Sequence, residues 1–84
     1  MKPAEAEILY ARGLAKFKLG QYSRALDDFS TAFRLDPNNS AAIYGRGLTK
    51  AKMGDATAGA TDMDQAKNMN PDIAARMAKF GLAQ

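Results

Sequence analysis

The chain has 84 residues, a net charge of +3 and 46% hydrophobic residues, the size and composition of one small globular domain. It contains neither cysteine nor histidine, which excludes disulfides and thiolate metal sites and removes the commonest metal ligand and general base. The small net charge does not by itself indicate nucleic-acid binding. The sequence contains no run of about 18 apolar residues, the length that would predict a membrane span. If it is a complete protein, we expect it in the cytoplasm, because its first residues lack an apolar signal core; a fragment of a longer, exported protein would carry no such expectation.

Apolar residues recur at spacings of three and four along the chain, which is typical of helices with one buried face. Gly20 and Gly54 interrupt this helical pattern, and Pro37 and Pro71 mark two further interruptions. The predicted helices run over about 4–18, 22–35, 41–52, 56–69 and 72–80.

The helix ends carry recognisable signals. Pro3 suits a first helical turn, where its missing N–H would have no partner in any case. Asn39 or Ser40 is the predicted N-cap of the third helix, and Asp55 that of the fourth. The last helix places Ile73, Met77 and Phe80 on one face.

The chain repeats itself after 34 residues. Residues 6–39 align with 40–73 without gaps, and ten of the 34 positions are identical, where typical composition gives about two by chance. The identical pairs are Tyr10/Tyr44, Arg12/Arg46, Gly13/Gly47, Leu14/Leu48, Lys16/Lys50, Lys18/Lys52, Gly20/Gly54, Asp28/Asp62, Ala32/Ala66 and Pro37/Pro71. Such a repeat of helix pairs predicts that successive pairs stack and share a core.

This period of two helices resembles the tetratricopeptide repeat. The resemblance rests on residues of the first repeat, Gly13, Gly20, Ala25, Phe29, Ala32 and Pro37, and on their counterparts Gly47, Gly54, Gly59, Met63, Ala66 and Pro71. It implies an all-α fold, a right-handed solenoid of five helices in a single domain 1–84. Within it we expect repeat 1 at 6–39, repeat 2 at 40–73 and a capping helix at 72–82.

The sequence departs from the family pattern at several positions. Arg12 and Lys16, with their second-repeat equivalents, replace an apolar and an aromatic residue, and we expect them to bury their methylenes while their charges stay in water. Gly59 replaces the alanine of the motif and is expected to weaken its helix by about 1 kcal/mol.

In the family, the first helix of each repeat lines a concave groove that holds a peptide or a helix. The resemblance therefore implies a non-catalytic protein–protein interaction module without a cofactor. By register, the predicted peptide-binding residues are Tyr10, Leu14, Phe17, Lys18, Tyr44, Leu48 and Lys52. The competing interpretation is that the tyrosines and leucines have only a packing role on the concave side of the solenoid. The first-repeat positions at which chaperone-binding relatives grip a C-terminal carboxylate hold Tyr10 and Leu14 here, so the chain does not resemble that type.

Charge suggests a ligand class. Residues 41–53 carry three cations, Arg46, Lys50 and Lys52, and no acid, whereas the second helix of each repeat is acidic. Our hypothesis is therefore an acidic or C-terminal peptide ligand, and the competing interpretation is a solvated charged face.

Other classes of function are less well supported. Catalysis or metal binding would rely on Asp27/Asp28 and Asp62/Asp64, which lie on the second helices and are expected to face outward. A helix-turn-helix interpretation with nucleic acid conflicts with the 34-residue period and the acidic helices. The alternative function is self-assembly: the N-terminal end has no evident cap and is expected to expose Ile8 and Ala11, which predicts a monomer or a weak homodimer.

Overall fold

The computed structural model describes residues 2–79, and this part of the chain is helical with no strand. The helices are α1 (Pro3–Lys18), α2 (Tyr22–Leu35), α3 (Ser40–Lys52), α4 (Ala56–Met69) and α5 (Ile73–Lys79). The predicted helices are confirmed, with ends that differ by no more than one residue where the structure describes them. Phe80 and the end of the predicted capping helix, 80–82, lie outside the described residues.

The helix ends have the predicted local chemistry. The side chain of Asn39 accepts a hydrogen bond from the backbone N–H of Ala42 at 3.2 Å, and Asp55 makes the equivalent bond at the start of α4, also at 3.2 Å. Gly20 and Gly54 have φ angles of 78° and 97°, a region in which any residue with a Cβ is strained. These two glycines therefore allow the sharp turns within each helix pair.

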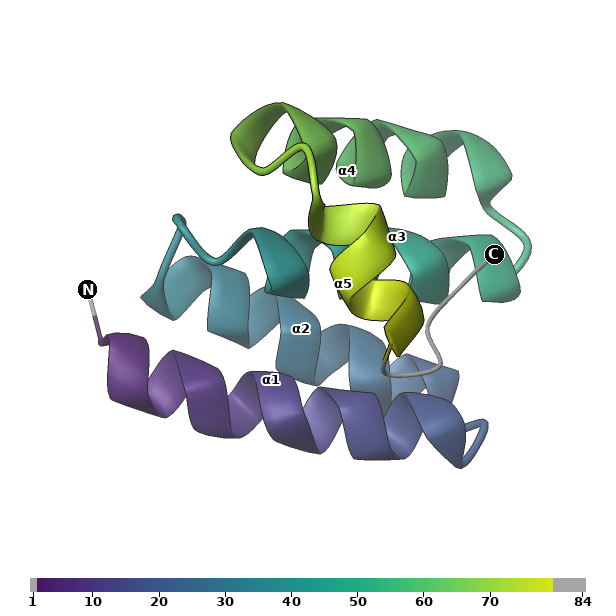
Figure 1. Cartoon of the computed structure of the whole chain (residues 1–84). Coiled ribbons are helices and arrows are strands. Elements are labelled where there is room, and N and C mark those ends of the chain that lie inside the picture. Colours follow the sequence, from purple (N-terminus) through teal and green to yellow (C-terminus); the bar gives the residue numbers. More distant parts are fainter. Residues whose placement is uncertain (1, 80–84) are drawn as a thin grey trace.

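Two antiparallel helix pairs, α1–α2 and α3–α4, are stacked so that α2 packs on α3, and α5 crosses α3 (Figure 1). The centre of the stack is Phe29, which is fully buried between α1 and α3. A Cβ at Gly13 would lie 2.9 Å from its ring, and one at Gly45 would lie 2.8 Å away. Both neighbouring helices therefore need glycine where they contact this ring.

The second helix pair makes an equally close contact, between Gly47 of α3 and Gly59 of α4. A Cβ built on Gly59 would lie 2.5 Å from the carbonyl oxygen of Gly47, and the reverse distance is 2.6 Å. The backbone contact thus requires glycine at position 59, and this role adds to the predicted cost in helix propensity.

The largest core cluster joins the two repeats to α5. Ile43, Tyr44 and Leu48 of α3 pack with Ile73 and Met77 of α5, and all five are at most 4% exposed. Because the described part of α5 has seven residues, this packing, and not its own helix propensity, holds it in place.

Candidate functional site

The inner face of the stack, where the groove is predicted, is partly covered by α5. Tyr44 and Leu48 are 4% and 2% exposed and lie in one cluster with Ile73 and Met77. Neither residue is open to a ligand in this structure, which favours the core interpretation of these two positions.

The other predicted peptide-binding residues differ in exposure. Tyr10, Leu14 and Phe17 are half-buried and pack against the core cluster, whereas Lys18 and Lys52 are exposed at the far ends of α1 and α3. Of the seven predicted residues, Tyr10 is the one that lines the cavity described next.

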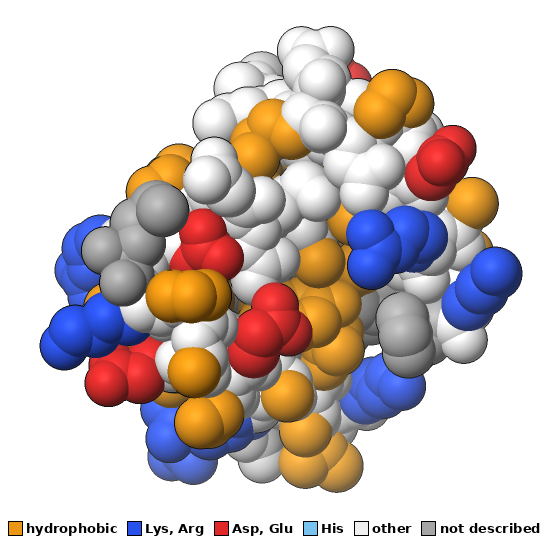
Figure 2. Space-filling view, turned by 60° about the vertical axis from the view of Figure 1, so that its left-hand side comes forward, with side chains coloured by type: hydrophobic (Ala, Val, Ile, Leu, Met, Phe, Trp, Pro, Cys, Tyr) orange, Lys and Arg blue, Asp and Glu red, His pale blue; other side chains and the backbone are white. Residues whose placement is uncertain are grey.

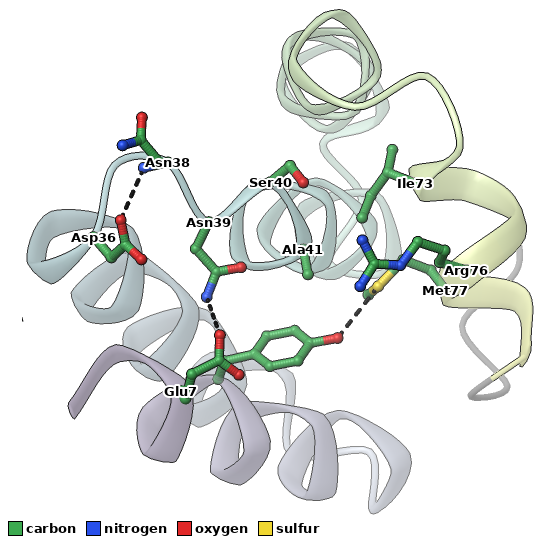
Figure 3. Close-up of a pocket in the computed structure, with 10 residues that line it drawn as sticks. Glu7, Asp36, Asn38, Asn39, Ser40, Ala41, Ile73, Arg76 and Met77 are labelled. Carbon is green, nitrogen blue, oxygen red and sulfur yellow. Dashed lines mark hydrogen bonds between the residues drawn. The ribbon is translucent and has the colours of Figure 1, made fainter. Parts of the chain in front are cut away.

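A cavity of about 390 Å³ opens between the first half of α1, the turn from α2 to α3, and α5 (Figure 3). Its apolar lining comes from Tyr10, Ala41, Ile73 and Met77. Polar side chains complete the lining, namely Glu7, Asp36, Asn38, Asn39, Ser40 and Arg76. Figure 2 shows an apolar strip in the middle of one face of the molecule, with an acidic side chain on one side and basic side chains on the other.

Hydrogen bonds hold the walls of the cavity in place. The Tyr10 hydroxyl donates to Sδ of Met77 at 3.3 Å and so joins α1 to α5. The side-chain amide of Asn39 donates to a carboxylate oxygen of Glu7 at 3.4 Å, and Asp36 accepts from the backbone N–H of Asn38 at 3.2 Å. Three segments that are distant in sequence are thereby fixed around one space.

The cavity has mixed charge. Glu7 and Asp36 carry negative charges, and Arg76 reaches in from α5 with a positive one (Figure 3). Burial raises the pKa of Tyr10 to about 12, the negative charge of Glu7 adds to this effect, and Arg76 opposes it. The Tyr10 hydroxyl therefore stays protonated at neutral pH and remains a hydrogen-bond donor.

Two carboxylates that sequence reasoning placed outside are buried. Asp28 is held by Arg12 (Nη2 to Oδ1, 2.8 Å) and by Lys16 (Nζ to Oδ2, 3.0 Å), and 6% of its side chain is exposed. In the second repeat, Asp62 is held in the same way, with 8% of its side chain exposed; Arg46 and Lys50 each approach it to 2.9 Å. The expectation of outward-facing acids is wrong for these two residues.

The neighbours of these buried acids behave as predicted: Asp27 and Asp64 are exposed. The signal for the difference was present in the sequence, because Asp28/Asp62 are identical in the two repeats and Asp27 and Asp64 have no such counterpart. The arginine and the lysine that repeat together with this aspartate are its ion-pair partners.

The ion pairs also change the charge of the predicted groove. Arg46 and Lys50 turn their charged groups to Asp62, which corrects the expectation that these charges stay in water. The hypothesis of an acidic ligand therefore loses two of its three cations, and only Lys52 of that set remains exposed. The acidity of the ligand stays a prediction.

Within residues 2–79, no three carboxylate side chains converge in a way that could hold a metal ion. None of the helices that the structure describes is long and apolar enough to cross a membrane.

The stacked antiparallel helix pairs and the inner face define an all-α helical repeat protein. The family model of the tetratricopeptide repeat matches residues 6–39, the first repeat. Comparisons with curated proteins and with solved structures found no match. The family match and the five-helix structure together fit a tetratricopeptide repeat protein, a family whose members generally act as non-catalytic protein–protein interaction modules.

Proposed function

We propose that this chain binds a peptide segment of a partner protein and that the cavity between α1, the α2–α3 turn and α5 is the principal contact. The observation that carries the proposal is the cavity itself, which combines an apolar floor with hydrogen-bonding groups at its edge. Its volume of about 390 Å³ lies in the range of small ligand sites, so it accommodates one or two side chains of a peptide.

The lining indicates what such a side chain looks like. Tyr10, Ile73 and Met77 offer apolar contact, while Glu7 and Arg76 offer a carboxylate and a guanidinium. The best occupant is therefore a side chain with an apolar body and a polar end, presented by a segment lying along α1. The rest of the segment would contact the exposed surface between α1 and α5.

The test starts from a pull-down with the full chain in a lysate of its source organism, followed by affinity measurements with a synthetic peptide from the captured partner. Arg76→Glu reverses the only positive charge among the residues that line the cavity. The matched control is Lys79→Glu, the same change of charge on the same helix at an exposed residue outside the lining.

We expect Arg76→Glu to weaken the peptide at least tenfold, whereas Lys79→Glu leaves its affinity within about twofold of the native value; tenfold is about 1.4 kcal/mol. Circular dichroism melting curves establish that both variants are folded. Equal binding by the native chain and both variants would remove the cavity as the binding site.

A further inference from the structure

The outer side of α1 carries an apolar stripe that no other part of the described chain covers. It consists of Ala4, Ile8, Ala11 and Ala15, with Leu19 directly after the helix; all five are exposed. Their spacing puts them on one side of the helix, opposite the buried Ala6 and Gly13. Ile8 and Leu19, at 68% and 72%, are the most exposed large hydrophobic residues among 2–79.

The internal repeat shows what this side of a helix does elsewhere in the same molecule. Shifted by 34 residues, Ile8, Ala11 and Ala15 correspond to Ala42, Gly45 and Thr49 of α3. All three counterparts are buried. Ala42 packs with Ala32 of α2, and Gly45 lies against the Phe29 ring. In the second repeat, therefore, this side of the helix is an interface with a preceding helix.

The two equivalent arginines show the same difference. Arg46 stacks on the ring of Phe33 at 4.9 Å from its centroid, and 18% of its side chain is exposed. Arg12, at the edge of the stripe, makes the same pair with its aspartate but is 58% exposed. The stripe thus corresponds to an interface surface that no helix within residues 2–79 covers.

The charges along α1 indicate which helix fits. The first half carries Glu5 and Glu7, and the second half carries Lys18 together with Arg12 and Lys16, which are paired with Asp28. A second α1 packed antiparallel places each acidic half beside the basic half of the other copy, whereas a parallel arrangement brings like charges together.

The positions of the stripe are also symmetric for an antiparallel pair. With the two-fold axis between residues 11 and 12, Ile8 lies level with Ala15 of the other copy, and Leu19 lies level with Ala4. Each large side chain then meets a small one, so the two helices can approach closely. On the same scheme Glu5 lies level with Lys18.

We propose that the outer side of α1 binds a second copy of this chain in an antiparallel, two-fold symmetric dimer. None of the stripe residues lines the cavity, which α1 contacts through Glu7 and Tyr10. One side of a 16-residue helix buries less than the roughly 800 Å² per partner of stable interfaces, so the dimer is reversible and depends on concentration.

Sedimentation equilibrium over a range of concentrations tests the association. We expect the average mass to rise from 9.0 kDa toward twice that value. Ile8→Glu places a charge in the stripe and should raise the dissociation constant at least tenfold. Met69→Glu, at an exposed hydrophobic residue of α4, is the matched control and should leave it unchanged. A mass of 9.0 kDa at all concentrations, or equal effects of the two variants, would overturn the proposal.

The orientation is tested by single cysteines, because the native chain has none. Ala11→Cys lies next to the two-fold axis and should form a disulfide between identical copies under mild oxidation. Ala4→Cys should not cross-link with itself but should cross-link with Leu19→Cys when the two variants are mixed. Efficient self-cross-linking of Ala4→Cys would indicate a parallel pair and contradict the proposal.

Discussion

Asp28 and Asp62 lie inside the two helix pairs, each held by an arginine and a lysine from the preceding helix. Hydrogen bonding to Arg12 lowers the pKa of Asp28 despite its burial, and Lys16 adds to this effect. Burial by itself raises the pKa of Asp62, but the hydrogen bonds from Arg46 and Lys50 outweigh it, so this pKa is also lowered. Both carboxylates are therefore ionised at neutral pH, and their partners are what makes burial tolerable.

Replacing the buried aspartate of the first repeat tests this role. We expect Asp28→Asn to lower the free energy of unfolding by about 1.5–3 kcal/mol, the usual range for a hydrogen bond to a charged group. Urea denaturation at pH 7 measures the change. Asp27→Asn is the control, since Asp27 is exposed on the same helix and should change stability by less than about 0.5 kcal/mol. Similar losses in the two variants would mean that the ion pairs contribute little.

Gly59 provides a second test at the scale of one residue. Gly59→Ala gains about 1 kcal/mol of helix propensity. We nevertheless expect a lower melting temperature, because the added Cβ would lie 2.5 Å from the Gly47 carbonyl oxygen and overpacking costs about 1–3 kcal/mol.

The control for this variant is Asn68→Ala, which also raises helix propensity in α4 but at an exposed position, and which should raise the melting temperature slightly. If Gly59→Ala were stabilised as much as Asn68→Ala, the close contact between α3 and α4 would not be a constraint.

At the scale of the element, α5 decides how much of the inner face is open. It buries Ile73 and Met77, each 1% exposed, over Tyr44 and Leu48. A helix of this length is marginal in water by itself, so its position depends on these two side chains.

We expect Met77→Ala to destabilise the fold by about 2–5 kcal/mol, the range for truncating a buried methionine. It should also loosen α5, which hydrogen exchange of the α5 amides would detect as lost protection. Lys79→Ala, an exposed change on the same helix, should leave both measurements near the native values. Unchanged exchange in Met77→Ala would show that α5 is held by other contacts.

The elements were largely predictable from the sequence, and the reasons are local. Gly20, Gly54, Asn39 and Asp55 act through their own backbone conformation or through a neighbour three residues away. The inner face was less predictable, because the burial of Tyr44 depends on where α5 packs, and helical spacing alone does not specify that. The register predicted a residue on the cavity, Tyr10, but not the cavity, which needs three distant segments to meet.

For the molecule as a whole, the two lowered carboxylate pKa values link folding to pH. An unfolded aspartate titrates near 3.9, and the folded values of Asp28 and Asp62 lie below their ordinary value. The native state therefore holds fewer protons on these groups, so their contribution to stability is fully present well above pH 4. It is lost as pH falls through the folded pKa values.

We expect the free energy of unfolding of the native chain to decrease as the pH falls from about 4 through the folded pKa values of these two groups. In the double variant Asp28→Asn/Asp62→Asn the decrease should be shallower, because two of the responsible groups no longer titrate. Urea titrations at intervals of half a pH unit give both curves. If the stability curves of the native chain and the double variant ran parallel, carboxylates other than Asp28 and Asp62 would be responsible for the loss of stability in acid.

The two buried aspartates and their ion-pair partners affect how such a chain can gain further repeats during evolution. Both partners of Asp28 lie within 6–39, and both partners of Asp62 lie within 40–73. A tandem copy of either segment thus contains both the buried carboxylate and the cations that pair with it. Duplication or exchange of whole segments therefore leaves no unpaired carboxylate in the core. An exchange whose boundary falls between the arginine and the aspartate of one segment separates the pair and leaves the buried carboxylate without that partner.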